Sequence, residues 1–398
     1  MIVERLSLTD FRNYARAELE LSTGPTVLVG SNGQGKTNLA EAIAYLATAG
    51  SHRVSSDAPL VRDGSDFAIV RATLAHSERR LNVDVQINRQ GSNRARVNGS
   101  GIRTGELGRY AHVVLFAPED LQIVRGDPGA RRRFADQLLV QRYPRLSATL
   151  ADYDRVLKQR GALLKSARAR RLDSEALPTL DVWDDKLVAL GVDIMRAREA
   201  LVRDLAGPIA DAYASIAGAD HMPDARWVLS ADGADPDDDE GPASVTETGD
   251  LFERFRAALR EKRSSELERG VNLVGPHRDD LLLSLRGLPA RGYASHGESW
   301  SLALALRIAS AHLLRAESQL GDPIVILDDV FAELDAGRRA RLADIVGDFE
   351  QVIVTAAVEQ DVPAALRVGT VRVEAGTLSG SGTSPRTGVD GPVAGGAS

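Results

Sequence analysis

Hydrophobic and polar residues alternate along much of the first hundred positions, which is the period of half-buried β-strands. The alternation begins at residues 1–10 and recurs at 81–87, while an apolar run fills 26–29. Glycine, asparagine and serine residues such as those at 98–101 mark turns between these runs. The pattern predicts a mixed sheet in the first part of the chain.

The hydrophobic period changes near residue 128. From there to residue 205, apolar residues recur at helical spacing with few turn signals between them, which predicts a helical insertion. Residues 231–250 hold eight carboxylates and no Lys or Arg, so we expect a loose surface loop there. Strand and helix patterns then alternate from Val271 to about Glu374. The residues at 377–398 are mostly Gly, Ser, Thr and Pro and predict a disordered tail.

A glycine-rich segment joins the apolar strand at 26–29 to a helical pattern. It matches G-x-x-x-x-G-K-[ST], and a strand before it and a helix after it are the context in which this motif binds ATP. The glycines let backbone N–H groups approach the phosphates, the lysine reaches the terminal phosphates, and the threonine hydroxyl can ligate Mg²⁺. The alternative is a glycine-rich turn without a ligand. The predicted ATP-binding residues are Gly30, Ser31, Asn32, Gly33, Gln34, Gly35, Lys36 and Thr37.

A second apolar run, at 323–327, ends in two carboxylates, Asp328 and Asp329. Such a run is typical of a strand buried on both faces, and ligands of parallel sheets bind where such strands end. We therefore predict that Asp328 holds Mg²⁺ together with Thr37, and that Asp329 orients or deprotonates the attacking water. A strand followed by an acidic turn is the alternative interpretation.

Nearly three hundred residues separate these two motifs, whereas small P-loop kinases place theirs much closer. Between them, residues 295–300 precede an apolar helical pattern, and the first N–H groups of that helix form a second candidate anion site. Taken alone, Ser295 and Gly297 are equally well explained as an ordinary helix N-cap.

The order of these motifs resembles that of the ABC/SMC ATPases. Within that group, the blocks at 10–14, 30–38, 116–121, 131–134, 275–279 and 327–335 are similar to the RecF family. The resemblance implies that Ser295, Gly297 and Glu298 touch the γ-phosphate held by a second copy of the chain. It also implies an ATP-dependent homodimer on single- or double-stranded DNA at gaps or junctions, weak DNA-dependent ATP hydrolysis, and support for RecA loading with RecO and RecR.

Three positions depart from the usual ABC pattern. His296 and Glu298 replace residues that are commonly glycine and glutamine, and Asp329 replaces the catalytic glutamate. No histidine follows the apolar run at 351–355. These departures argue against fast hydrolysis and leave the sensor of the γ-phosphate open.

Together the motifs predict an α/β protein with an ABC/SMC-type P-loop ATPase lobe and an inserted, mainly helical second lobe. The ATPase lobe would comprise residues 1–125 and 266–376, with the insertion at 126–265. An SMC-like structural ATPase is an alternative, although the insertion is too short for a long coiled coil. An ABC-type nucleotide-binding subunit is another, although the RecF-like blocks and the helical insertion with its basic face argue against it.

Composition narrows the function further. The chain of 398 residues has a net charge of −7, so only local patches can bind nucleic acid. Residues 125–171 hold thirteen Lys or Arg against four Asp, and residues 71–109 hold eight Arg against three acids. Within the first stretch, Arg131, Arg132 and Arg133 are candidate DNA contacts, and a solvated helix face is the alternative. The absence of cysteine and of a signal peptide predicts a cytoplasmic protein.

Overall fold

The computed structural model describes residues 1–54, 56–170, 178–233 and 250–380. The first sheet is antiparallel, and its strands run in the order β2-β1-β4-β5-β6-β7. Its strands are β1 (Ile2–Phe11), β2 (Tyr14–Glu20), β4 (Phe67–His76), β5 (Arg79–Asn88), β6 (Arg94–Val97) and β7 (Ser100–Ile102). The long strands β1, β4 and β5 alternate buried with more exposed residues, as a sheet with one face on a core requires.

The second sheet joins strands from both ends of the chain in the order β15-β14-β3-β13-β12-β8. All its pairs are parallel except β14 with β15. Its strands are β3 (Gly24–Val29), β8 (Val113–Phe116), β12 (Ile324–Asp328), β13 (Gln351–Ala356), β14 (Gly369–Glu374) and β15 (Thr377–Gly380). The mixed sheet predicted for the first part is therefore wrong, because β3 leaves its antiparallel neighbours to pair with strands from residues 351–374.

Successive residues of β12 pack into two different cores, because side chains alternate across a strand. Ile324 and Ile326 join the core between the two sheets, where α1 (Lys36–Thr48) lies. Val325 and Leu327 join the core on the other face, under α8 (His296–Glu317) and α9 (Ala336–Gly347). Burial on both faces explains the continuous apolar run that the sequence shows at this strand.

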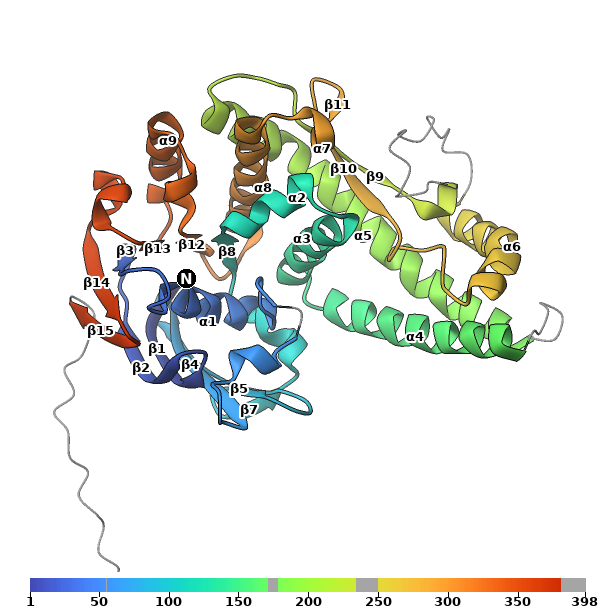
Figure 1. Cartoon of the computed structure of the whole chain (residues 1–398), viewed down its shortest axis with the longest axis horizontal. Helices are drawn as coiled ribbons and strands as arrows, with labels where there is room; N and C mark the ends of the chain where they lie inside the picture. Colours follow the sequence, from blue (N-terminus) through green and yellow to red (C-terminus); the bar gives the residue numbers. More distant parts are fainter. Residues whose placement is uncertain (55, 171–177, 234–249, 381–398) are drawn as a thin grey trace, which may run out of the picture.

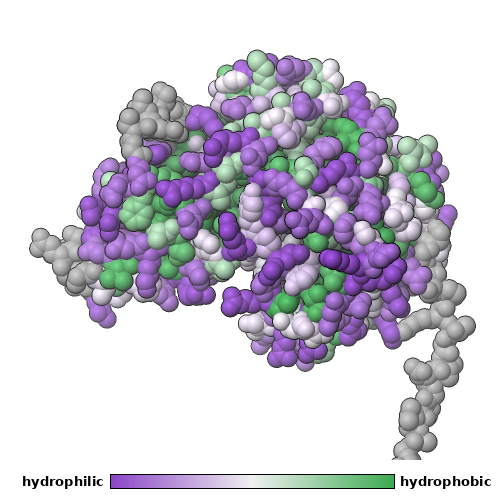
Figure 2. All heavy atoms as spheres, turned by 180° about the vertical axis from the view of Figure 1, so that it is seen from behind, coloured by the Kyte–Doolittle hydropathy of each residue, from purple (hydrophilic) through white to green (hydrophobic). Residues whose placement is uncertain are grey.

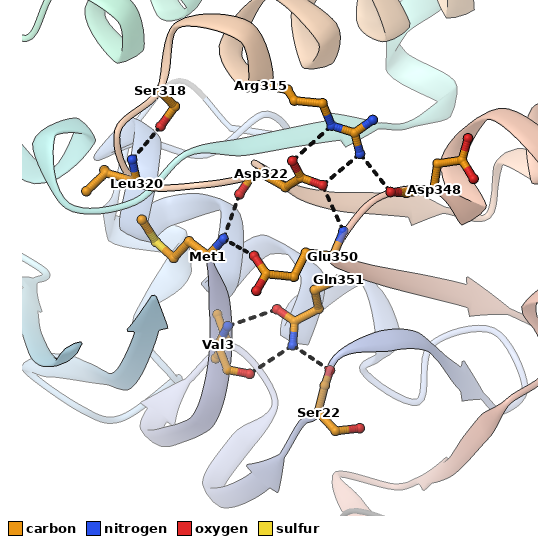
Figure 3. A network of polar contacts seen from close by, with 10 residues as sticks. All are labelled: Met1, Val3, Ser22, Arg315, Ser318, Leu320, Asp322, Asp348, Glu350 and Gln351. Carbon is orange, nitrogen blue, oxygen red and sulfur yellow. Dashed lines mark hydrogen bonds and ion pairs between the residues drawn. The ribbon is translucent and has the colours of Figure 1, made fainter. Parts of the chain in front are cut away.

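A buried glutamine joins the two sheets. The side chain of Gln351, which is fully buried, donates to the carbonyl oxygens of Val3 and Ser22 at 2.9 and 3.0 Å and accepts from the Val3 N–H at 2.8 Å. Figure 3 shows this contact beside the ion pair of Arg315 with Asp322, which also accepts from the Glu350 N–H. The start of β1 is thereby held against the start of β13.

The residues between the two halves of the second sheet form mostly helices, which extend away from the sheets in Figure 1. A small antiparallel sheet, β9 (Asp224–Val228), β10 (Asp280–Leu285) and β11 (Leu288–Pro289), lies over them. The helices are α2 (Leu121–Arg125), α3 (Pro128–Arg142), α4 (Leu146–Arg170), α5 (Pro178–Ala217), α6 (Leu251–Arg269) and α7 (Ala290–Tyr293). We call α4, α5 and α6 the arm.

A buried ion network holds the three helices of the arm together. Arg160 of α4 is fully buried and pairs with Asp184 of α5 at 2.6 Å and with Glu266 of α6 at 2.5 Å. Its third nitrogen donates to Asn272 at 2.7 Å. Because every polar group of this guanidinium has a partner, its burial is compensated.

The predicted tail begins too early, since residues 377–380 form β15. Ala375 and Gly376 both have positive φ, 47° and 78°, which is the geometry of the two-residue turn that joins hairpin strands. Residues 381–398 of the predicted tail, and 234–249 of the predicted acidic loop, lie outside the described residues. Hydrophilic side chains cover most of the face drawn in Figure 2, with small apolar groups between them.

Candidate ATP-binding site

The loop from Gly30 to Gly35 connects the end of β3 to the start of α1, as its motif predicts. Gly33 and Gly35 have φ of 81° and 116°, a region that side chains with a Cβ rarely adopt. A Cβ at Gly30 would overlap the carbonyl oxygen of Val373 on the neighbouring strand. The three glycines are thus required by the backbone itself, and the Gly30 N–H donates to the Ala356 carbonyl at the end of β13 at 3.3 Å.

Lys36 is the first residue of α1, and it is only 3% exposed. Its ammonium donates to the carbonyl oxygen of Ser31 at 3.3 Å, so the side chain folds back over the loop. The side chain therefore lies against the loop and does not extend into open space. The ammonium nevertheless lies above the phosphate-binding backbone, where a phosphate oxygen can replace the carbonyl oxygen as its partner.

Residues outside the motif hold the loop in place. The Asn13 amide donates to the Gln34 carbonyl at 3.0 Å, and the Tyr14 hydroxyl donates to the Gly35 carbonyl at 3.1 Å. The Gln34 side chain accepts from the Ala375 N–H of the β14–β15 turn at 2.6 Å. No role was predicted for Asn13, Tyr14 or Ala375, because their contacts join segments that are far apart in the chain.

The end of β12 brings the predicted metal ligands together. The Thr37 hydroxyl donates to Asp328 Oδ1 at 3.0 Å, and the Thr355 hydroxyl donates to the same oxygen at 2.6 Å. The pKa of Asp328 is raised to about 6, chiefly by burial; the neighbouring Asp329 adds to the shift, and the two hydroxyl donors oppose it. The carboxylate is therefore a buried anion with only neutral donors beside it, which is a site that favours a cation.

Thr355 is a site residue that the sequence analysis missed. It is the last residue but one of β13, directly beside Asp328 in the parallel register, and its hydroxyl also accepts from the Asp329 N–H at 2.9 Å. Asp329 has a φ of 51°, which turns the chain sharply after the strand. Thr355 could have been found from the parallel alignment of the ends of β12 and β13, but only if these two strands were known to pair.

These residues fit an Mg²⁺–ATP complex by their chemistry. Magnesium in nucleotide sites takes one or two protein oxygens, and phosphate oxygens and water complete its octahedron. Thr37 and Asp328 offer two such oxygens within contact of each other. No cluster of three or more His, Asp or Glu suited to a metal occurs among the residues that the structure describes, so the phosphates would have to supply further ligands.

The predicted signature residues lie at the start of α8. Ser295 caps the helix and forms a reciprocal capping box with Glu298. The carboxylate of Glu298 accepts from the Ser295 N–H at 2.8 Å and pairs with Arg286, and these contacts lower its pKa to about 2. A Cβ at Gly297 would come within 2.9 Å of the Arg338 guanidinium. Ser295 is exposed, and its side chain is fixed by its own helix.

The three candidate DNA contacts differ in the structure. Arg131 is 4% exposed and forms a two-point ion pair with Asp280 at 2.6 and 2.8 Å, so it is not available to a DNA phosphate. Arg132 is half-buried and donates to the Asp279 carbonyl at 2.7 Å. Only Arg133 is exposed. The prediction is therefore corrected for Arg131, which joins α3 to β10 instead. None of the helices formed by the described residues has the length and apolar character needed to cross a membrane.

Comparison with known proteins agrees with this geometry. The family described as RecF/RecN/SMC N terminal domain matches residues 2–379. The protein is 57% identical over 391 residues to the DNA replication and repair protein RecF of Clavibacter sepedonicus, covering 96% of each chain. It is 53% identical over 369 residues to the protein of that name from Frankia alni, covering 92% of this chain and 96% of the relative.

The chain also resembles solved structures of RecF and of an Smc head domain. The structure described as the recombination mediator protein RecF-ATPrS in the RecFOR pathway matches with a TM-score of 0.83 at 25% identity, covering 96% of this chain and 98% of that one. An Smc head domain with a coiled coil and joint from Pyrococcus yayanosii shares the fold alone, with a TM-score of 0.51 at 14% identity and 96% and 97% coverage. The predicted ABC/SMC-type fold is confirmed, and the chain belongs to the RecF family.

Proposed function

We propose that the protein is an ATP-gated DNA-binding protein of recombinational DNA repair and replication restart. The contact of Thr37 with Asp328 carries the ATP part of this proposal, because it unites a phosphate-binding helix start with a buried carboxylate. The relatives named DNA replication and repair protein RecF support the DNA part. The alternatives, an SMC-like structural ATPase or an ABC-type subunit, have no such support, and the arm folds on itself through Arg160.

In this proposal the loop at 30–37 binds the phosphates of ATP, and Thr37 and Asp328 hold Mg²⁺. Asp329 orients the attacking water from the sharp turn after β12. Aspartate reaches less far than the usual glutamate, so ATP hydrolysis is weak. In this proposal DNA stimulates the hydrolysis, which works as a switch. The ion supplies charge neutralisation to the phosphates, and the chain supplies the positioning.

A second copy of the chain completes the site. Ser295, Gly297 and Glu298 lie at the N-terminus of a long helix, whose N–H groups attract anions. Ser295 is exposed, and its side chain contacts only its own first turn, so this surface is open to the γ-phosphate bound by a partner. ATP would therefore close a homodimer on DNA, single- or double-stranded, at gaps or junctions.

The solved relative is described as a recombination mediator in the RecFOR pathway. On that basis we include RecO and RecR as partners, support for RecA loading at gaps as the outcome, and the cytoplasm as the location. Pull-down of RecR by the ATP-bound protein, compared with the nucleotide-free protein, tests this part separately.

One experiment tests the central claim. DNA affinity is measured with and without ATP at several salt concentrations, for the wild type and for Ser295→Arg. Closing a dimer brings two copies of each basic surface to one duplex, so the salt slope should steepen with ATP, by about 0.9 for each added phosphate contact. Ser295→Arg should remove the steepening but keep ATP binding, which a thermal-shift assay reports. An equal slope with and without ATP in the wild type would contradict the proposal.

A further inference from the structure

Both basic stretches of the sequence contribute to one groove. A cavity of about 1130 Å³ lies between the 3₁₀ helix at Thr104–Arg109 and the junction of α3 with α4. The two walls touch at Gly105, where a Cβ would overlap the Ser147 hydroxyl. Five arginines line the groove, against two acidic residues. The arginines are Arg103, Arg109, Arg142, Arg145 and Arg155.

Two of these arginines carry charge that no acid neutralises. Arg109 and Arg155 pair with the two acidic residues of the groove, at 3.4 and 2.7 Å. Arg103 and Arg145 are exposed, and neither forms an ion pair with any residue in the described part of the chain. One lies on each wall, so an anion in the groove can contact both.

A third arginine has a free donor inside the protein. The side chain of Arg142 is 2% exposed and pairs with Glu317 and Asp204, at 2.5 and 2.7 Å. Its Nη1 is buried and has no hydrogen-bond partner among the described residues. An unmatched donor of a buried guanidinium is costly, and Arg142 lies in the wall of the groove. Because its side chain is buried and its charge is paired twice, Arg142 supports the Tyr143 ring from inside and leaves phosphate contact to the exposed arginines.

The groove also contains an exposed aromatic ring. Tyr143 is 41% exposed, and the guanidinium of Arg142 lies 5.0 Å from the centre of its ring. That cation–π contact holds the ring at the end of α3, so little conformational entropy is lost when a flat ligand stacks on it. An aromatic ring among arginines is how proteins bind the bases of unpaired strands without reading their sequence.

We propose that this groove binds an unpaired nucleic-acid strand, with its phosphates on Arg103 and Arg145 and one base stacked on Tyr143. The inference rests on the proposed function and adds to it which part of a gapped substrate is held here. A duplex keeps its bases stacked inside and offers no free base face to Tyr143, so the groove discriminates in favour of the single strand. Figure 1 shows α4 diverging from β5 and β7 in this region.

Fluorescence anisotropy with a labelled single-stranded oligonucleotide and a duplex of equal length, both with ATP, tests the inference. Tyr143→Ala should weaken single-strand binding about ten-fold and leave duplex binding unchanged, because stacking is lost. Tyr143→Phe should restore the affinity. Arg145→Gln should lower the salt slope on the single strand by about 0.7, the value for one phosphate contact. The control is Arg260→Gln, an equal change of charge at an exposed position on α6.

Two results would overturn the inference while leaving the proposed function intact. In the first, the wild type binds DNA when ATP is present, but Tyr143→Ala and Arg145→Gln bind the single strand with the same affinity as the control, Arg260→Gln. The other is an equal loss on single strand and duplex in Tyr143→Ala, which would exclude stacking. If the wild type binds neither the single strand nor the duplex when ATP is present, the proposed function itself is overturned. Thermal melting confirms that each variant is folded.

Discussion

The Thr37 hydroxyl donates to the Asp328 carboxylate over 3.0 Å, although 291 residues separate the two in the chain. The first residue belongs to the start of α1 and the second to the end of β12, so the contact exists only when both halves of the parallel sheet have assembled around β13. The ATP site is thus a product of the closed fold, and a fragment that contains the loop at 30–37 alone would lack Asp328.

We expect Asp328→Asn to stabilise the nucleotide-free protein. Burial raises the folded-state pKa of Asp328 to about 6, from a model-compound value of 3.8. The folded state therefore binds its proton more tightly than the unfolded state, and the free energy of unfolding falls as the pH rises between these values. The amide oxygen keeps both hydroxyl bonds and removes the charge, for a gain of roughly 3 kcal/mol at pH 7.

The gain should largely disappear near pH 4, where the wild-type carboxyl is protonated in the folded state and about half protonated in the unfolded state. Urea unfolding at pH 4 and pH 7 measures the difference. The control is Asp344→Asn, the same change at an exposed position on α9. If Asp328→Asn is less stable than the wild type at pH 7, the buried carboxylate is better compensated than its contacts indicate. The same variant should lose the stabilisation that Mg²⁺–ATP confers on the wild type.

Lys36→Ala should bind ATP far more weakly and melt within a few degrees of the wild type. The ammonium makes one hydrogen bond, to the Ser31 carbonyl, so its loss costs about 1 kcal/mol of stability. Isothermal titration with ATP and a thermal melt separate the two effects. Lys36→Arg is the companion variant, since a planar guanidinium keeps the charge but not the compact ammonium. Unchanged ATP affinity in a folded Lys36→Ala protein would refute the assignment of the phosphate-binding loop.

Gln351→Leu should lower the free energy of unfolding by about 3 kcal/mol or more. The variant leaves the Val3 N–H without its acceptor, and the Val3 and Ser22 carbonyls without their donor, and unmatched buried polar groups cost about 1–3 kcal/mol each. The matched control is Gln360→Leu, at an exposed position where we expect less than about 0.5 kcal/mol. Equal unfolding curves for the two variants would show that Gln351 does not join the sheets.

Local patterns predicted the parts of the site that each lie within one segment. The loop at 30–37 follows from a motif whose letters have separate physical roles, and Asp328 follows from the end of a doubly buried strand. The structure adds Thr355, Asn13 and Tyr14, each of which acts through a contact with a distant segment. No local pattern shows which strands become neighbours, so the roles of these three residues could not be predicted from the sequence.

The same reason explains the errors of the sequence analysis. A run of arginines at 131–133 looks like a phosphate-binding surface, but helical geometry turns successive residues in different directions, and Arg131 points at Asp280. The strand at 377–380 has a polar composition typical of disorder, yet a hairpin turn pairs it with β14. In both cases a tertiary partner, absent from the local window, decides the outcome.

The start of α8 is held against the small sheet by an arginine. Arg286 lies in the turn between β10 and β11, where it pairs with Glu298 and donates its N–H to the His221 carbonyl at 2.7 Å. The turn thereby connects the small sheet beside the arm to the signature residues. Arg286→Gln should weaken ATP-dependent dimerisation, because Glu298 loses the partner that holds the helix start against the small sheet. ATP affinity of the monomer should stay within two-fold, roughly, since Arg286 is not part of the loop at 30–37.

Sedimentation with ATP measures the dimer, and titration of ATP at low protein concentration measures the monomer. The contacts of Glu298, first the Ser295 N–H and then Arg286, lower its folded pKa to about 2. The carboxylate therefore stays charged from pH 7 down to pH 4, and the stabilisation it provides is lost only as the pH falls further, toward 2. A dimer that weakens between pH 7 and pH 5 in the wild type must do so through another group, and Arg286→Gln should then leave that pH dependence unchanged. If instead Arg286→Gln dimerises with ATP like the wild type, the small sheet does not position the signature residues.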